Sequence, residues 1–374
     1  MDSVTYKCPN CDGGLEFDPE SQKFKCGYCL SQFVEAELKK QEPDAGQNSE
    51  KQAADKKSES ATTESIYGSS TDGAADGGVE DEDSSVVLYS CPSCGAGIVT
   101  DETTASTYCY YCHNPVVLSG KLEGKYRPDC VLPFEMDKKK AGEIFKSWIS
   151  RKKYVPKDFY SPKQMELLEG IYYPYWLYDC EIDGKITADA TKMNVSRIGA
   201  IEYTERNRFK VERAGTMKVE NVTRNALKKA DHRLSEGVLP FDMEKQRPFQ
   251  GGYLSGFKSE RRDLEKDVYE EEVRREIEEF AVGQLQSSIT GYQTVSVSDH
   301  EEKLLSSRWK YALMPVWVLT YRDGKSDKLY YFAMNGQSGK ICGVLPVDYK
   351  RLAGLFATIF VPFFILFLIG GYFI

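Results

Sequence analysis

The chain is 374 residues long, with 41% apolar residues, 28% charged residues and a formal net charge of −8. This composition excludes a chain that is disordered throughout, a membrane protein with many spans and a strongly basic nucleic-acid-binding protein. The length is sufficient for two or three folded units.

Cysteines are concentrated near the N-terminus. Of eleven cysteines, eight form four Cys-x-x-Cys pairs, and the sequence Cys-x2-Cys-x14-Cys-x2-Cys occurs twice, at residues 8–29 and 91–112. This spacing is typical of a metal site and not of a disulfide framework. The predicted ligands are Cys8, Cys11, Cys26 and Cys29 in the first site and Cys91, Cys94, Cys109 and Cys112 in the second.

Four thiolates arranged in a tetrahedron suit zinc best. A site closed by four protein ligands leaves no open coordination position for catalysis. We therefore expect two structural zinc ions, with an iron centre or redox dithiols as the alternatives. His113 directly follows Cys112 and could replace a cysteine ligand, although a surface neighbour is the favoured interpretation. The first residues show no signal-peptide pattern, which favours a reducing compartment where thiolates stay available to metal.

The cysteine modules divide the N-terminal third. We predict a zinc ribbon at 1–40, an acidic disordered linker at 41–86 and a second zinc ribbon at 87–123. The linker holds 12 Asp and Glu residues against 3 Lys and almost no large apolar side chain, so it cannot bury enough surface to offset its conformational entropy.

The body that follows contains a second repeat. VLPFEMDK at 131–138 returns as VLPFDMEK at 238–245, and Tyr-Pro-Tyr-Trp at 173–176 matches Met-Pro-Val-Trp at 314–317. The same order of motifs predicts two related α+β halves, at 124–230 and 231–350.

Hydrophobic periodicity assigns elements within these halves. It predicts helices around 141–149 and 273–281, where apolar residues recur at intervals of three and four. Aromatic and β-branched runs predict strands at 171–178, 311–321 and 329–334, with a turn at Asn335-Gly336.

The last 23 residues, 352–374, carry no charge. At a rise of about 1.5 Å per residue, a helix of this length extends about 35 Å, which is enough to cross a hydrocarbon core of about 30 Å. Lys350 and Arg351 stand immediately before it, so the positive-inside rule predicts a cell-membrane tail anchor with the N-terminal bulk in the cytoplasm.

Two other function classes fit this sequence less well. A nucleic-acid-binding factor is disfavoured because residues 88–115 hold Asp101 and Glu102 but no Lys or Arg, although a basic groove around Arg206, Arg208, Lys210 and Arg213 would support it. An enzyme is disfavoured because no Gly-Lys pair lies in a phosphate-binding loop motif and none of the three histidines lies in a catalytic motif. The four tryptophans could form an aromatic groove, but core packing is the expected role.

This order of parts, with two ribbons, the body motifs, FAMNGQSGK at 332–340 and a terminal apolar helix, resembles bacterial TFIIB-type zinc-ribbon membrane proteins of the YdjG type. Some such proteins are labelled PriA-like helicases, a label that this chain does not support without a nucleotide-binding motif. The resemblance implies a scaffold that recruits SPFH/virion-core-like and phage-shock-protein-A-like proteins, and a paralogous zinc-ribbon membrane protein, to the membrane under envelope stress. It also implies that the eight cysteines bind metal.

Overall fold

The computed structural model describes residues 3–38, 87–324 and 327–372, so the linker predicted at 41–86 lies outside the described residues. The first ribbon is a small antiparallel sheet in the order β1-β2-β3, followed by a short helix, α1. Their bounds are β1 Leu15–Asp18, β2 Lys23–Cys26, β3 Gln32–Phe33 and α1 Glu35–Leu38.

The second ribbon is divided between two sheets. Strands β4 and β5 pair with each other, whereas β6 and β7 join the main sheet because β6 pairs with β12. The bounds are β4 Val87–Ser90, β5 Gly97–Thr100, β6 Thr104–Tyr108, β7 Pro115–Val117 and β12 Lys258–Glu260. The second ribbon is thus continuous with the body through backbone hydrogen bonds.

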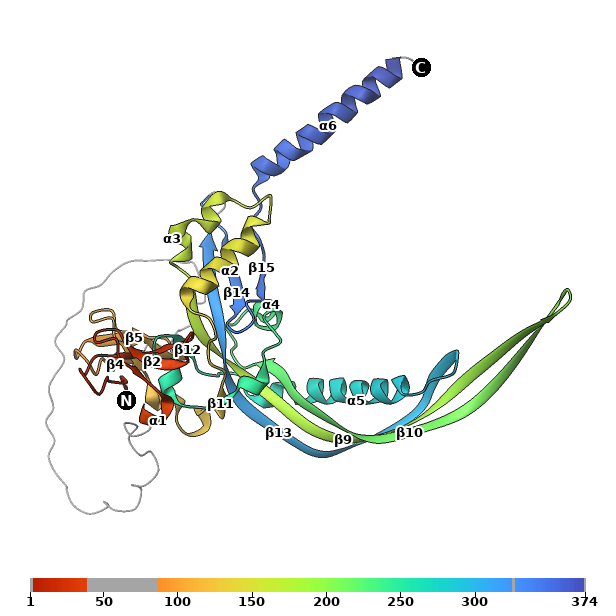
Figure 1. Ribbon diagram of the computed structural model, residues 1–374, viewed down its shortest axis with the longest axis horizontal. Helices are drawn as coiled ribbons and strands as arrows, with labels where there is room; N and C mark the ends of the chain where they lie inside the picture. Colours follow the sequence, from red (N-terminus) through yellow and green to blue (C-terminus); the bar gives the residue numbers. More distant parts are fainter. Residues whose placement is uncertain (1–2, 39–86, 325–326, 373–374) are drawn as a thin grey trace, which may run out of the picture.

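Three very long strands dominate the body: β9 Glu169–Ile198, β10 Ile201–Asn225 and β13 Thr294–Arg322. Strand β9 pairs with both β10 and β13 in antiparallel registers. Beyond Tyr178 of β9, which pairs with Val222 of β10 and Trp309 of β13, the three strands form a curved extension, here called the arm (Figure 1). Helix α5, Glu270–Ser287, lies along one face of the arm. It packs Val273, Ile277, Ala281 and Leu285 against the apolar positions of β9.

A glycine pair allows this helix to approach the sheet closely. Gly184 of β9 lies opposite Gly215 of β10, and a Cβ added at Gly184 would lie 3.1 Å from Leu285 Cδ1. The arm therefore has one apolar face under α5, built from small and β-branched side chains, and one polar face.

Shorter elements complete the body around the proximal ends of the long strands. The strands are β8 Cys130–Val131, β11 Arg247–Pro248, β14 Leu329–Asn335 and β15 Ile341–Gly343. The helices are α2 Lys138–Ser150, α3 Pro162–Met165 and α4 His232–Gly237. The predicted helices around 141–149 and 273–281 are confirmed as parts of α2 and α5, and the three predicted strands lie in β9, β13 and β14.

The two ranges expected to be related halves share one sheet. Strand β9 of the first range pairs with β13 of the second, and Met314 lies opposite Tyr173 in this register. The matched motifs therefore begin opposite each other and run in opposite directions, so that Trp176 pairs with Tyr311 and Trp317 pairs with Gly170. Their origin by duplication stays a prediction, and the mixed α+β fold class is confirmed.

The final helix, α6, spans Tyr349–Tyr372, contains Pro362 and projects away from the body (Figure 1). The segment Tyr349–Gly371 is long and apolar enough to cross a membrane. The most apolar part of this segment is not buried against the rest of the described chain. A core helix of a soluble protein would be mostly buried, so the exposure of this apolar surface agrees with the predicted anchor.

Candidate metal centres

The first cysteine cluster forms where the two knuckles of the first ribbon meet. Cys8 and Cys11 lie in the turn before β1, and Cys26 and Cys29 lie at the end of β2. The Sγ atoms of Cys8 and Cys29 are 3.5 Å apart, as are those of Cys11 and Cys26. All four sulfurs lie within 4.8 Å of one another.

The second ribbon repeats this arrangement. Cys91 and Cys94 lie between β4 and β5, and Cys109 and Cys112 lie between β6 and β7. The Sγ atoms of Cys91 and Cys112 are 3.7 Å apart, and those of Cys94 and Cys109 are 3.6 Å apart. Every sequence-predicted ligand is therefore brought into one of two four-sulfur groups.

Each knuckle closes with the same backbone turn. The residue after its second cysteine has a left-handed conformation, with φ of 57° at Asp12, 60° at Leu30, 74° at Gly95 and 55° at His113. The turn lets the backbone N–H of the next residue donate to the sulfur, as Gly13 does for Cys11 and Ser31 for Cys29. His113 is an exposed turn residue, which agrees with its interpretation as a surface neighbour.

The thiols within each cluster differ in acidity. Hydrogen bonds with the Ser31 side chain and backbone lower the pKa of Cys29 to about 6. The Gly13 N–H lowers the pKa of Cys11, but the thiols of Cys26 and Cys29 outweigh it and raise that pKa to about 12. Four crowded sulfurs cannot all carry negative charge without a cation between them, and a divalent metal supplies that charge.

The geometry fits a tetrahedral ion. With Zn–S bonds of about 2.3 Å, a tetrahedron places its sulfurs about 3.8 Å apart. The four sulfur–sulfur separations given above, 3.5 to 3.7 Å, are close to this value. All four positions are filled by protein sulfur, so a metal bound here would hold the fold together and have no free position for a substrate.

The two ribbons are docked together and onto the body. Val4 and Val117 exchange backbone hydrogen bonds of 2.8 and 2.9 Å, which joins the first ribbon to β7 of the second. The Phe17 N–H donates to the Ser255 carbonyl at 2.9 Å, and Tyr253 packs in T-shaped contact with Phe17 at 5.1 Å. This docking was not predicted, because no local sequence pattern reports a contact between residues more than 100 positions apart.

Sequence reasoning also missed the exposed side chains at the knuckle tips. Tyr28 and Leu30 of the first ribbon are 71% and 66% exposed, and Tyr110 and Tyr111 of the second are 67% and 75% exposed. The available signal was their position between or just after paired cysteines, where a side chain points away from the metal. Exposed tyrosines on a rigid turn are typical of protein-binding surfaces.

The basic groove considered for nucleic acid does not form from its four residues together. Arg206, Arg208 and Lys210 lie at alternate positions of β10 and share one face, whereas Arg213 lies on the other face. Lys210 is also directly opposite Asp189 of β9. The strand thus places three of these charges on one face and the fourth on the other, so the four do not line a common groove.

A cavity of about 290 Å³ lies between α4 and the sheet, with Tyr173, Tyr175 and Asp231 among its lining residues. Burial raises the pKa of Tyr173 to about 12 and also raises that of Tyr175. Both phenols stay protonated near neutral pH, so neither supplies a base there.

The four tryptophans, which were expected in the core, and the three cysteines outside the ribbons all pack in or against apolar clusters. Trp176 and Trp317 are buried, and Trp148 and Trp309 pack against the same core. Cys130 and Cys180 are buried within apolar clusters, and Cys342 packs beside one of them. The tryptophans therefore belong to the core and do not line an open aromatic groove.

Among curated proteins, the chain is similar to one from Bacillus subtilis (strain 168) named "Uncharacterized protein YdjG". The two are 26% identical over 323 residues, which cover 73% of this chain and 94% of that protein. No family profile matches the chain, and no solved structure matches it. The similarity supports the YdjG-type resemblance.

Proposed function

We propose that the protein is a membrane-anchored scaffold whose two zinc ribbons bind protein partners. The observation that carries this proposal is the set of exposed apolar side chains, Tyr28, Leu30, Tyr110 and Tyr111, presented on the metal knuckles. Zinc is the proposed metal at both cysteine clusters, because four thiolates and the sulfur separations suit it and the resemblance implies it. Its role is to fix the turns that present these side chains.

The proposed location is the cell membrane, with α6 as a single span and the remainder in the cytoplasm. Lys350 and Arg351 precede the apolar segment, which favours this orientation. The thiolates of both clusters also need a reducing compartment. Anchoring concentrates two linked ribbons at one surface, so a partner with several binding sites gains affinity without any new contact.

The proposed partners follow from the resemblance. They are an SPFH/virion-core-like protein, through it a phage-shock-protein-A-like coat protein, and a paralogous zinc-ribbon membrane protein, in a response to envelope stress. The proposed scaffold needs no reaction of its own. Nucleic acid is the less favoured partner because the second ribbon, over residues 88–115, carries no Lys or Arg.

The test compares affinity-purified full-length protein with a knuckle variant, Tyr28→Ser with Tyr110→Ser and Tyr111→Ser, from gently solubilised membranes. A matched arm variant, Val195→Ser with Ile198→Ser and Tyr203→Ser, removes three side chains that are also at least 50% exposed. We expect the SPFH-like partner to be lost from the knuckle variant alone while both variants keep two metal ions per chain. Loss from the arm variant alone would overturn the ribbon assignment, as would recovery of nuclease-resistant nucleic-acid machinery in place of such a partner.

A further inference from the structure

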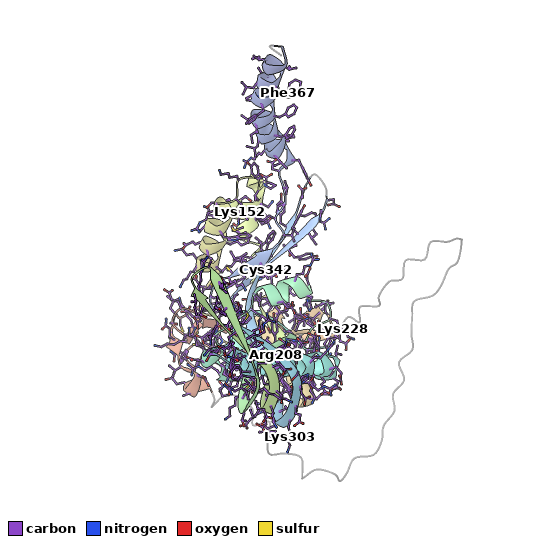
Figure 2. The ribbon with its side chains drawn as sticks, turned by 90° about the vertical axis from the view of Figure 1, so that its right-hand side faces the viewer. Lys152, Arg208, Lys228, Lys303, Cys342 and Phe367 are labelled. Carbon is purple, nitrogen blue, oxygen red and sulfur yellow. The ribbon has the colours of Figure 1, made fainter. Side chains whose placement is uncertain are left out.

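The body meets the first turn of α6 through a segment nearly 200 residues earlier in the chain. The Asp348 N–H donates to the Tyr154 carbonyl at 2.7 Å, and the Arg351 guanidinium donates to the Val155 carbonyl at 3.3 Å. These bonds hold the loop after α2 against the start of the apolar helix. Figure 2 shows Lys152 of this loop near the base of α6, and Lys303 of the arm at the opposite end of the body.

The loop brings a second group of positive charges to the base of α6. Arg151, Lys152 and Lys153 are exposed, as is Lys350. Arg351 is half-buried, and its Nε lies 3.4 Å from Asp348 Oδ2. We call these five cations the basic collar.

Two carboxylates lie in the same segments and oppose the collar. Asp348 is mostly buried and already paired with Arg351, whereas Asp158 is exposed. The five cations thus outnumber the two acids by three. The sequence alone placed only Lys350 and Arg351 beside the apolar helix, so the fold more than doubles the positive charge there.

Ordinary structural roles account for only part of this charge. A cation at the C-terminus of α2 interacts favourably with the helix dipole, and Arg151 occupies that C-cap position. Lys152 lies 5.4 Å from the Trp148 ring centroid, which keeps its ammonium at the surface beside an aromatic side chain. Neither role requires three consecutive cations, Arg151 to Lys153, at the foot of a helix that is apolar enough to span a bilayer.

Neighbouring side chains suit the boundary between water and lipid. Tyr349 begins α6 and is 76% exposed. Tyrosine and tryptophan favour the headgroup level, where one part of the ring is apolar and the other is wet. Tyr349 therefore lies where a bilayer surface would meet the body.

We propose that the basic collar binds the headgroups of anionic phospholipids in the leaflet that α6 enters. This inference rests on the proposed membrane location. Exposed cations within a Debye length of an anionic surface are attracted to it, and that length is about 10 Å at 0.1 M salt. The collar holds the body at a fixed height and tilt against the membrane, because its charges come from two segments that are hydrogen-bonded to each other.

The experiment uses the full-length protein in phosphatidylcholine vesicles that contain a trace of spin-labelled phosphatidylglycerol or spin-labelled phosphatidylcholine. Electron paramagnetic resonance measures the preference of the protein for the anionic label. The test variant is Arg151→Gln with Lys152→Gln and Lys153→Gln. The matched control is Lys210→Gln with Lys218→Gln and Lys303→Gln, which removes the same charge from exposed sites on the arm.

We expect the wild type to prefer phosphatidylglycerol. The preference should fall at least about fivefold in the test variant, because the variant removes three cations and a single cation at an anionic surface contributes about that factor. The control variant should keep the preference for phosphatidylglycerol, and 1 M salt should weaken that preference in the wild type. Equal preference in wild type and test variant, with α6 resistant to carbonate extraction, would overturn the collar but not the anchor. Extraction of the wild type by carbonate would overturn both.

Discussion

The junction between the first ribbon and the body gives the sharpest test of the architecture. Tyr253 belongs to the body but packs between two ribbon side chains, Phe17 at 5.1 Å and Phe24 at 5.9 Å between ring centroids. It is 5% exposed, and its hydroxyl donates to Glu35 Oε2 at 2.7 Å. We predict that Tyr253→Ala releases the first ribbon from the body without removing its metal.

The free-energy cost of Tyr253→Ala at this junction follows from the area that the tyrosine side chain buries. A buried aromatic side chain removes about 150 to 250 Å² from water, which at about 25 cal/mol per Å² corresponds to about 4 kcal/mol or more. Truncation to alanine of buried aromatic residues costs a similar amount, about 3 to 5 kcal/mol. At about 1.4 kcal/mol per factor of ten, undocking should become on the order of a thousandfold more frequent.

Hydrogen exchange, measured by mass spectrometry on the protein in detergent micelles, reports how often the first ribbon undocks from the body. The amide of Phe17 bonds to the Ser255 carbonyl across the junction, whereas the amide of Cys8 bonds to the Gly13 carbonyl inside the knuckle. Peptides with Phe17 should exchange faster in Tyr253→Ala, while those with Cys8 stay protected. The control, Tyr253→Phe, loses only the hydroxyl bond, which is worth about 1 kcal/mol. Unchanged exchange at Phe17 in the alanine variant would refute the docked arrangement.

Three further predictions address the metal, the anchor and a buried lysine. Cys26→Ser should lower the metal content from two ions per chain to one, measured by elemental analysis, and full retention would contradict the first site. Deletion of 352–374 should move the protein from the carbonate-washed membrane pellet to the supernatant; a truncated form that still pellets would disprove the anchor. Burial, followed by the nearby Arg261 charge, lowers the pKa of Lys121 from 10.5 to about 8, so the folded state binds fewer protons than the unfolded state between these values. Stability should therefore rise with pH across that window in the wild type and rise less in Lys121→Met, as followed by thermal unfolding in detergent; parallel pH profiles would contradict the buried position.

The elements that were predicted well depend on short-range patterns. Phe145 and Ile149 recur at helical spacing in α2, and Val273, Ile277 and Ala281 do so in α5, so the buried face could be read from the sequence. The strand predicted at 171–178 was far too short, because β9 continues to Ile198. Beyond Tyr178 its apolar residues alternate with polar ones and are interrupted by Gly184, and the packing of α5 on them explains why this surface is buried.

Local patterns in the sequence were enough to predict the two groups of four cysteines, the apolar terminal segment and the helices α2 and α5, because short-range spacing sets which side chains share a turn or a helix face. The length of the arm, the docking of the ribbons on Tyr253 and Val117, and the basic collar emerge from the folded chain alone. Those features depend on partners far apart in the chain, such as the loop at 151–155 and the helix start at 348–351. Periodicity shows which face of an element is apolar, but it does not show which distant segment covers that face or lies beside it.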